Sequence, residues 1–127
     1  MLPAPSGHFS IHLWFDSGLE LSQIARTFNR FMQFDFQETE RGYWIDEQTG
    51  PPGWSYVLLG PRPLDDPENL HLARYVFSAW FYDGKPGAPV NEQQARQHAR
   101  YLQLKIQREL EIPVLAHIET RGELTVI

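Results

Sequence analysis

The sequence predicts an α+β fold, in which a mostly antiparallel sheet carries two helices on one face. Three observations support this prediction. Several short segments alternate between apolar and polar residues, as strands do, two longer segments repeat apolar residues at helical spacing, and turns containing Gly or Pro separate them. A ferredoxin-like core with an added C-terminal hairpin is the simplest template for this order. Residues 1–127 fit a single domain, in which residues 1–7 are expected to be a flexible N-terminus.

The first strand is expected at residues 9–15, and a helix is expected directly after it. Apolar side chains at every second position, from Phe9 to Phe15, give this strand one apolar face. Residues 17–20 then have the S-x-x-E pattern of a capping box, and apolar residues at helical spacing continue as far as Met32. The helix is therefore predicted over residues 19–32.

Three short strands are expected next, at residues 34–37, 43–45 and 54–59. A turn containing Gly42 separates the first two, and a segment rich in Gly and Pro precedes the third. Pro residues follow the third strand directly and are typical of its end. Residues 60–69 are therefore expected to form a loop.

The segment 72–82 is the most informative part of the chain, because both of its alternating sides are apolar or aromatic. Its aromatic and β-branched residues favour a strand over a buried helix, and the turn at Asp83 and Gly84 supports the same interpretation. One side of such a strand can face the helices, while the other side needs a second cover. A second protomer, a partner protein, a ligand or the loop at 60–71 could supply that cover.

The C-terminal part predicts a second helix and a hairpin. Asn91 and Gln94 form the pattern of a capping box, apolar residues at helical spacing follow, and Pro113 ends the helix, which is expected over residues 91–111. Residues 114–120 and 123–127 are then expected to pair as strands across a two-residue turn.

Composition excludes several classes of function. The chain has no Cys, which excludes a disulfide framework, a thiolate nucleophile and a Cys-containing zinc site. It shows no signal-peptide pattern and no apolar run of about 20 residues, so a cytoplasmic protein without a membrane partner is expected. The net charge is −5, and the first 70 residues carry ten acids but four Arg. This balance disfavours nucleic acid as a partner and favours a basic protein.

No motif in the sequence identifies a reaction or a cofactor. A nucleophile elbow, a phosphate-binding Gly loop and a dinucleotide fingerprint are all missing, so no catalytic residue, cofactor or metal site is predicted. The sequence instead favours a small acidic protein-binding module that acts by occluding a partner, of the immunity-protein or inhibitor type. Its expected partner is a basic toxin or enzyme domain.

Aromatic anchors and acidic residues that attract a basic partner would form the surface of such a module. The residues expected at this surface are Trp14, Trp44, Trp80, Tyr82, Asp35, Glu38, Glu40, Asp46 and Glu47.

The alternative is a dimeric α+β enzyme or a small-ligand-binding protein with a His-containing pocket. If the helices cover the Phe9 side of the first strand, His12 points to the opposite, open face of the sheet. His117 and Glu119 share one face of the penultimate expected strand and could complete a ligand pocket with His12. A homodimer formed by two such sheets would also cover the open face.

Overall fold

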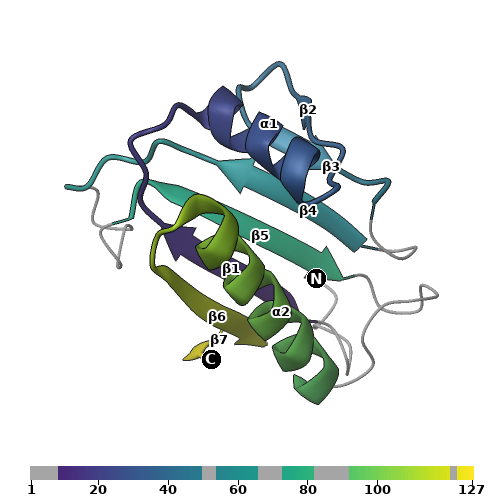
Figure 1. The fold of residues 1–127 in the computed structure, drawn as a ribbon. Helices are drawn as coiled ribbons and strands as arrows, with labels where there is room; N and C mark the ends of the chain where they lie inside the picture. The colour runs from purple at the N-terminus through teal and green to yellow at the C-terminus, as the bar shows by residue number, and fades with distance from the viewer. Residues whose placement is uncertain (1–8, 50–53, 66–72, 82–91, 121–122) are drawn as a thin grey trace.

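The structure is a computed structural model that describes residues 9–49, 54–65, 73–81, 92–120 and 123–127 (Figure 1). The described strands form one seven-stranded antiparallel sheet with the order β2-β3-β4-β5-β1-β6-β7. The α+β class and the antiparallel sheet predicted from the sequence are therefore confirmed. The elements in chain order are β1 (Ser10–Phe15), α1 (Leu21–Phe31), β2 (Gln37–Glu38), β3 (Trp44–Asp46), β4 (Trp54–Leu59), β5 (Tyr75–Phe81), α2 (Glu92–Leu110), β6 (Val114–Thr120) and β7 (Glu123–Val126).

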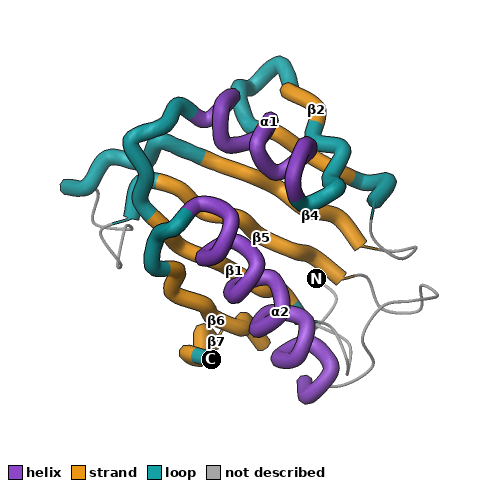
Figure 2. Tube along the Cα trace, viewed as in Figure 1, coloured by secondary structure: helices purple, strands orange, loops and turns teal. Residues whose placement is uncertain are grey.

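Both helices lie on the same face of the sheet, and α2 packs on β1 and β6 while α1 packs on β4 (Figures 1 and 2). Strand register explains which side chains they cover. Leu13 on β1 lies opposite Phe77 on β5 and Ala116 on β6, and these three side chains are buried. Because facing residues of antiparallel strands share one side of the sheet, this side forms the core.

The centre of the core is an aromatic cluster around Phe28 of α1, which is fully buried. Its ring lies 5.6–6.3 Å, centroid to centroid, from the rings of Phe15, Phe34, Phe36 and Phe77. Tilted and edge-on aromatic pairs at such distances each contribute about 0.5–1.5 kcal/mol beyond the area they bury. The cluster therefore fixes α1 against the middle of the sheet.

The start of α1 differs from the prediction. The helix begins at Leu21, with Glu20 as its N-cap residue, and the Glu20 backbone N–H donates to Gln23 Oε1 over 2.9 Å. Ser17, predicted to cap the helix, instead accepts a hydrogen bond from the Leu19 backbone N–H over 3.1 Å. Ser17 thus stabilises a turn before the helix, because a short hydroxyl side chain can bond to the backbone two residues on.

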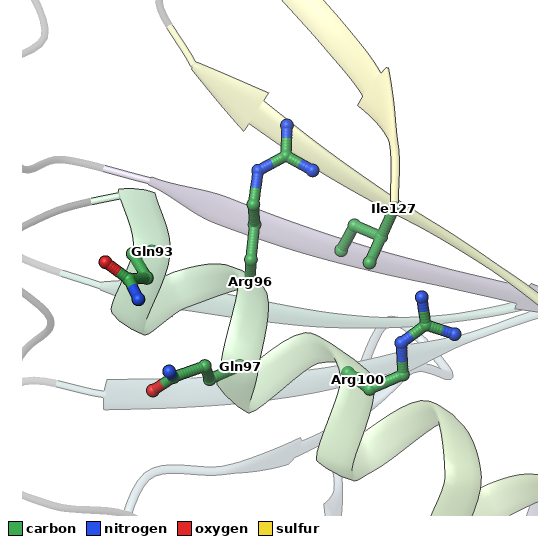
Figure 3. Close-up of a pocket in the computed structure, with 5 residues that line it drawn as sticks. All are labelled: Gln93, Arg96, Gln97, Arg100 and Ile127. Carbon is green, nitrogen blue, oxygen red and sulfur yellow. The ribbon is translucent and has the colours of Figure 1, made fainter.

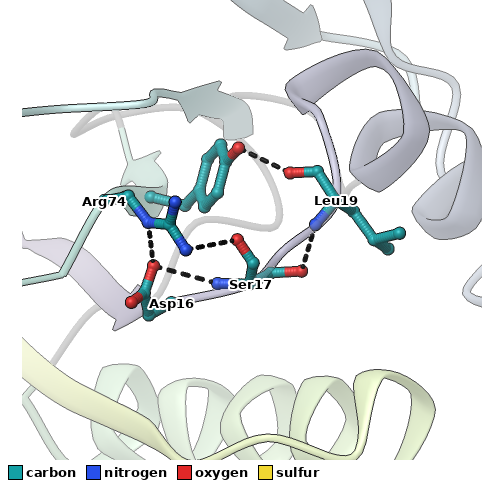
Figure 4. A network of polar contacts seen from close by, with 5 residues as sticks. Asp16, Ser17, Leu19 and Arg74 are labelled. Carbon is teal, nitrogen blue, oxygen red and sulfur yellow. Dashed lines mark hydrogen bonds and ion pairs between the residues drawn. The ribbon is translucent and has the colours of Figure 1, made fainter.

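The connection between β1 and α1 is held to the start of β5 (Figure 4). The Arg74 guanidinium pairs with Asp16 and also donates to the Ser17 carbonyl oxygen over 2.9 Å. The Tyr75 hydroxyl donates to the Leu19 carbonyl oxygen over 2.6 Å. These bonds join segments 56–58 residues apart in sequence, so they position the N-terminal end of α1 relative to the central strands.

The C-terminal elements agree with the prediction in type and order. α2 ends at Leu110, Glu111 follows in a left-handed conformation (φ 55°), and Pro113 precedes β6. β6 and β7 pair from His117–Val126 to Thr120–Glu123. The expected cap at Asn91, the turn at 121–122 and the N-terminal segment 1–7 lie outside the described residues.

Asp46 at the end of β3 organises the neighbouring connections. Its side chain is 1% exposed and accepts hydrogen bonds from the backbone N–H groups of Asp35, Gln48 and Thr49 over 2.7, 2.8 and 3.0 Å. Burial raises the pKa of this carboxyl, but a hydrogen bond from the Thr49 side chain and these three backbone bonds together lower it below its usual value. Asp46 is therefore a structural carboxylate that joins the segment after α1 to the segment after β3.

Replacing Asp46 with Ala is expected to lower the free energy of unfolding by about 2 kcal/mol, because the three backbone donors lose their acceptor. Urea denaturation of the two proteins measures this difference. Glu47→Ala is the matched control, since its exposed neighbouring carboxylate should change stability by less than about 0.5 kcal/mol. Equal losses in both variants would contradict the structural role of Asp46.

Candidate functional site

The face of the sheet opposite the helices, called the open face here, carries three rows of side chains that the strand register defines. No helix lies on this face within the described part of the chain (Figure 2). From β3 towards β7, the first row contains Ile45, Val57, Ser78, His12, His117 and Val126. The second contains Ser55, Trp80, Ser10, Glu119 and Leu124, and the third contains Leu59, Val76, Trp14 and Leu115.

His12 joins three strands of the open face through its two ring nitrogens. Nδ1 lies 2.8 Å from Ser78 Oγ, and Nε2 lies 2.9 Å from Glu119 Oε1. An ionised carboxylate can only accept, so a neutral His12 carries its proton on Nε2 and its Nδ1 accepts from the Ser78 hydroxyl. The three side chains thus form a continuous donor–acceptor chain from β5 across β1 to β6.

Glu119 is the accessible end of this series of hydrogen bonds. The Glu119 side chain is 37% exposed, whereas the His12 side chain is 11% exposed and Ser78 is buried. A ligand arriving from solvent would therefore meet the carboxylate first. In a serine hydrolase the hydroxyl must be the accessible group, so the order of exposure is reversed here.

The backbone around Ser78 also argues against acyl transfer. β5 pairs with β4 on one side and with β1 on the other, so its N–H groups take part in strand pairing. An oxyanion hole needs N–H groups that are free to point at a developing negative charge. Ser78 and His12 are therefore better suited to orient Glu119 than to attack a substrate.

Aromatic rings surround His12 on the open face. The Trp80 ring lies edge-on to it at 5.8 Å, and the Trp14 ring lies at 6.5 Å, centroid to centroid. The Arg62 guanidinium carbon lies 5.2 Å from the centre of the Trp14 ring, as in a cation–π contact. Trp14 and Trp80, both predicted as anchors, therefore lie on the same face as His12.

The margins of the open face are apolar and exposed. Five large apolar side chains on this face are at least 37% exposed, and they come from β4, β5, β6 and β7: Leu59, Trp80, Leu115, Leu124 and Val126. Contiguous exposed apolar patches of more than a few hundred Å² are uncommon on monomeric proteins, and such patches mark interaction surfaces.

The remaining residues of the predicted partner surface lie elsewhere. Trp44 faces the helices, because it pairs with the buried Leu58 and packs against the core, and Asp46 is buried. Tyr82 lies outside the described residues. The exposed acids Asp35, Glu38, Glu40 and Glu47 lie in and around β2 and β3, at the sheet edge opposite β7. The structure therefore does not gather the predicted aromatic and acidic residues into one surface.

The predicted ligand residues His12, His117 and Glu119 do lie together. His12 and His117 face each other across β1 and β6, and His117 is buried. Among the described residues, no group of three or more His, Asp or Glu side chains could hold a metal ion. No helix in the described part of the chain is long and apolar enough to cross a membrane.

A second titratable cluster, which the sequence did not reveal, lies on the helix side. The Tyr56 hydroxyl of β4 lies 3.2 Å from His98 Nε2 of α2, and the His98 ring stacks on the Tyr101 ring at 6.4 Å. Burial lowers the pKa of His98 to about 4 and raises the pKa of Tyr56, so both are uncharged at neutral pH. The i, i+3 spacing of His98 and Tyr101 indicates that these two side chains are neighbours on a helix. It does not indicate that Tyr56 of β4 contacts His98.

A cavity of about 490 Å³ lies between α2 and Ile127 (Figure 3). Arg96 and Arg100 flank it, one helical turn apart. Arg96 pairs with Glu92 over 3.2 Å, and Arg100 donates to Gln103 over 3.4 Å. Both guanidinium groups thus have partners on their own helix.

Comparisons with known proteins identify no relative of this chain. The chain matches no protein-family model, and the searches of curated proteins and of solved structures find no match.

The buried His98 is expected to make stability depend on pH. Its pKa is lower in the folded chain than the ordinary value of 6.5, so the unfolded chain takes up a proton first as the pH falls. The part of the folding stability that depends on a neutral His98 is therefore fully present above pH 6.5 and is lost as the pH falls towards 4. Between pH 7 and 4, wild type should lose about 3 kcal/mol more than His98→Gln, as urea denaturation at each pH would show. Parallel pH profiles of the two proteins would contradict the buried, neutral His98.

Proposed function

We propose that the protein is a protein-binding module that occludes a basic partner, and that it docks through the open face. The observation that supports this proposal most directly is the set of five exposed apolar side chains on that face, with Trp80 among them. Trp is enriched among the residues that supply most of the binding energy at interfaces, because it buries a large area at a low entropic cost. We infer that the protein acts as an inhibitor or immunity protein would, by covering its partner with this surface.

The expected charge of the partner follows from the electrostatics of the chain. The net charge is −5, and Glu119 is the acidic side chain in the three rows of the open face, where Arg62 lies over the ring of Trp14 in the third row. His12 bonds to the Glu119 carboxylate over 2.9 Å, and the Trp80 ring lies edge-on to His12 at 5.8 Å. A carboxylate suits a Lys or Arg side chain.

The double variant Trp80→Ser/Leu124→Ser tests this proposal, because it removes two exposed apolar contacts and leaves the core intact. Affinity capture from the source cells, followed by titration of the recovered partner, is expected to show at least about tenfold weaker binding. Leu104→Ser is the matched control, because Leu104 is 54% exposed but lies on α2. The Leu104→Ser protein should bind the partner as wild type does.

The proposal requires a basic protein in stoichiometric amount, lost in the double variant and kept in the control. If only the chain itself is recovered, as a dimer that the double variant does not form, the open face binds a second copy and the foreign partner is excluded. Equal capture by wild type and both variants would exclude the open face as the docking surface.

A second candidate function is supported by the chain of hydrogen bonds from Ser78 to Glu119. Buried polar networks are costly unless every member is paired, and they occur often where a group must be held in one orientation. The open face would then bind a small ligand carrying an ammonium group, which pairs with the Glu119 carboxylate that His12 holds in place.

This candidate predicts that n-butylammonium shifts the NMR signals of Glu119 and Trp80 in a saturable way, while n-butanol does not, because an ammonium pairs with the carboxylate. Glu119→Gln should abolish the shifts, whereas Glu123→Gln, an exposed acid on β7, should leave them unchanged. Shifts that persist in Glu119→Gln would overturn the assignment.

We also propose that the central part of the fold is ferredoxin-like. The support is topological: β4, β5, β1 and β6 are neighbours in that order, and one helix follows β1 and the other follows β5. On this interpretation β2 and β3 extend one edge, and β7 is the added strand of the C-terminal hairpin at the other.

A further inference from the structure

A cavity of about 190 Å³ lies on the helix side, between the end of α1, β4 and α2. It belongs to neither candidate above, since the sheet separates it from the open face. Met32, Phe34 and Leu102 supply apolar and aromatic lining. The lining residues with polar side-chain atoms are Gln33, Thr49, Tyr56, His98, Tyr101 and Lys105.

The inner wall is shaped by aromatic rings. The Phe34 ring meets the Tyr56 ring edge-on, with centroids 5.1 Å apart, and the Tyr56 ring lies 6.2 Å from the ring of His98. Tyr56 and His98 bond to each other over 3.2 Å and are uncharged near pH 7. A wall of uncharged rings favours a flat aromatic group over a charged one.

The rim of the cavity is positively charged. Lys105 Nζ bonds to the Tyr101 hydroxyl over 3.2 Å and lies 5.5 Å from the centre of its ring. Lys105 forms no ion pair within the described part of the chain, so its charge is available to a ligand. A smaller cavity of about 130 Å³, which shares Tyr101 and Lys105, continues to Arg108.

The volume limits the size of the ligand. An engineered protein cavity of about 150 Å³ holds benzene, so 190 Å³ accommodates one six-membered ring with a short substituent. A negatively charged substituent would reach the rim at Lys105 while the ring stays against Phe34 and Tyr56. A bicyclic ring system would need more space than the inner cavity offers.

We propose that this cavity binds a small monocyclic aromatic carboxylate, with its ring against Phe34 and Tyr56 and its carboxylate paired with Lys105. The cavity combines an uncharged aromatic interior with a cation at its rim. A neutral aromatic compound lacks the pairing with Lys105, and an aromatic amine would place a positive charge next to it.

Phenylacetate is the probe, and benzyl alcohol and benzylammonium are its neutral and cationic counterparts. Titration followed by NMR should give saturable binding of phenylacetate, with a Kd of about 0.1–1 mM and shifts at Tyr56, His98 and Tyr101. Lys105→Met, which keeps the length of the side chain and removes its charge, should weaken binding about tenfold.

Arg100→Met is the matched control, because Arg100 carries the same charge on α2 but lines the cavity beside Ile127 instead. Its affinity for phenylacetate should equal that of wild type. Weaker binding in Arg100→Met with full binding in Lys105→Met would move the anion to the other cavity and overturn the proposal. Equal affinities for the three probes, or no saturation up to about 10 mM, would overturn it as well.

Discussion

The structure depends on the strict alternation of side chains along β1. Ile11, Leu13 and Phe15 face the helices, so Ser10, His12 and Trp14 must face the other way. Because β1 lies between β5 and β6, its register fixes which residues of both neighbours share each side. A shift of one residue would bring His12 under the helices and expose Leu13, which a single buried core does not tolerate.

The two faces of the sheet consequently meet different physical demands. On the helix side, rings packed around Phe28 fill the space, and polar groups such as Tyr56 and His98 remain uncharged. On the open face, Ser10, Ser55 and Ser78 are small and buried, while Trp80 is large and partly exposed. His12 is compatible with this environment because both of its ring nitrogens have partners.

Local patterns predicted the strands and helices well, because alternation and helical spacing depend on residues near one another in sequence. They misplaced the start of α1, since Ser17 and Glu20 both carry capping side chains and only the structure shows which one caps. They placed His12, His117 and Glu119 on one face through alternation alone. Alternation does not show burial, so Asp46 was expected at a surface, and it does not show contacts over 42 residues, such as Tyr56 with His98.

The two proposed binding regions are opposite in charge and lie on opposite sides of the sheet. Glu119 offers a negative group bonded to His12, whereas Lys105 offers a positive group beside Tyr101. Changes at distant sites that share no partner usually have additive effects, so a variant in one region should leave binding at the other unchanged. Coupling between them would have to pass through the sheet. In β5, the Phe77 ring lies beside the rings of Phe34 and Tyr56, and the next residue, Ser78, bonds to His12. The fold therefore permits two separate ligands of opposite charge on one small domain.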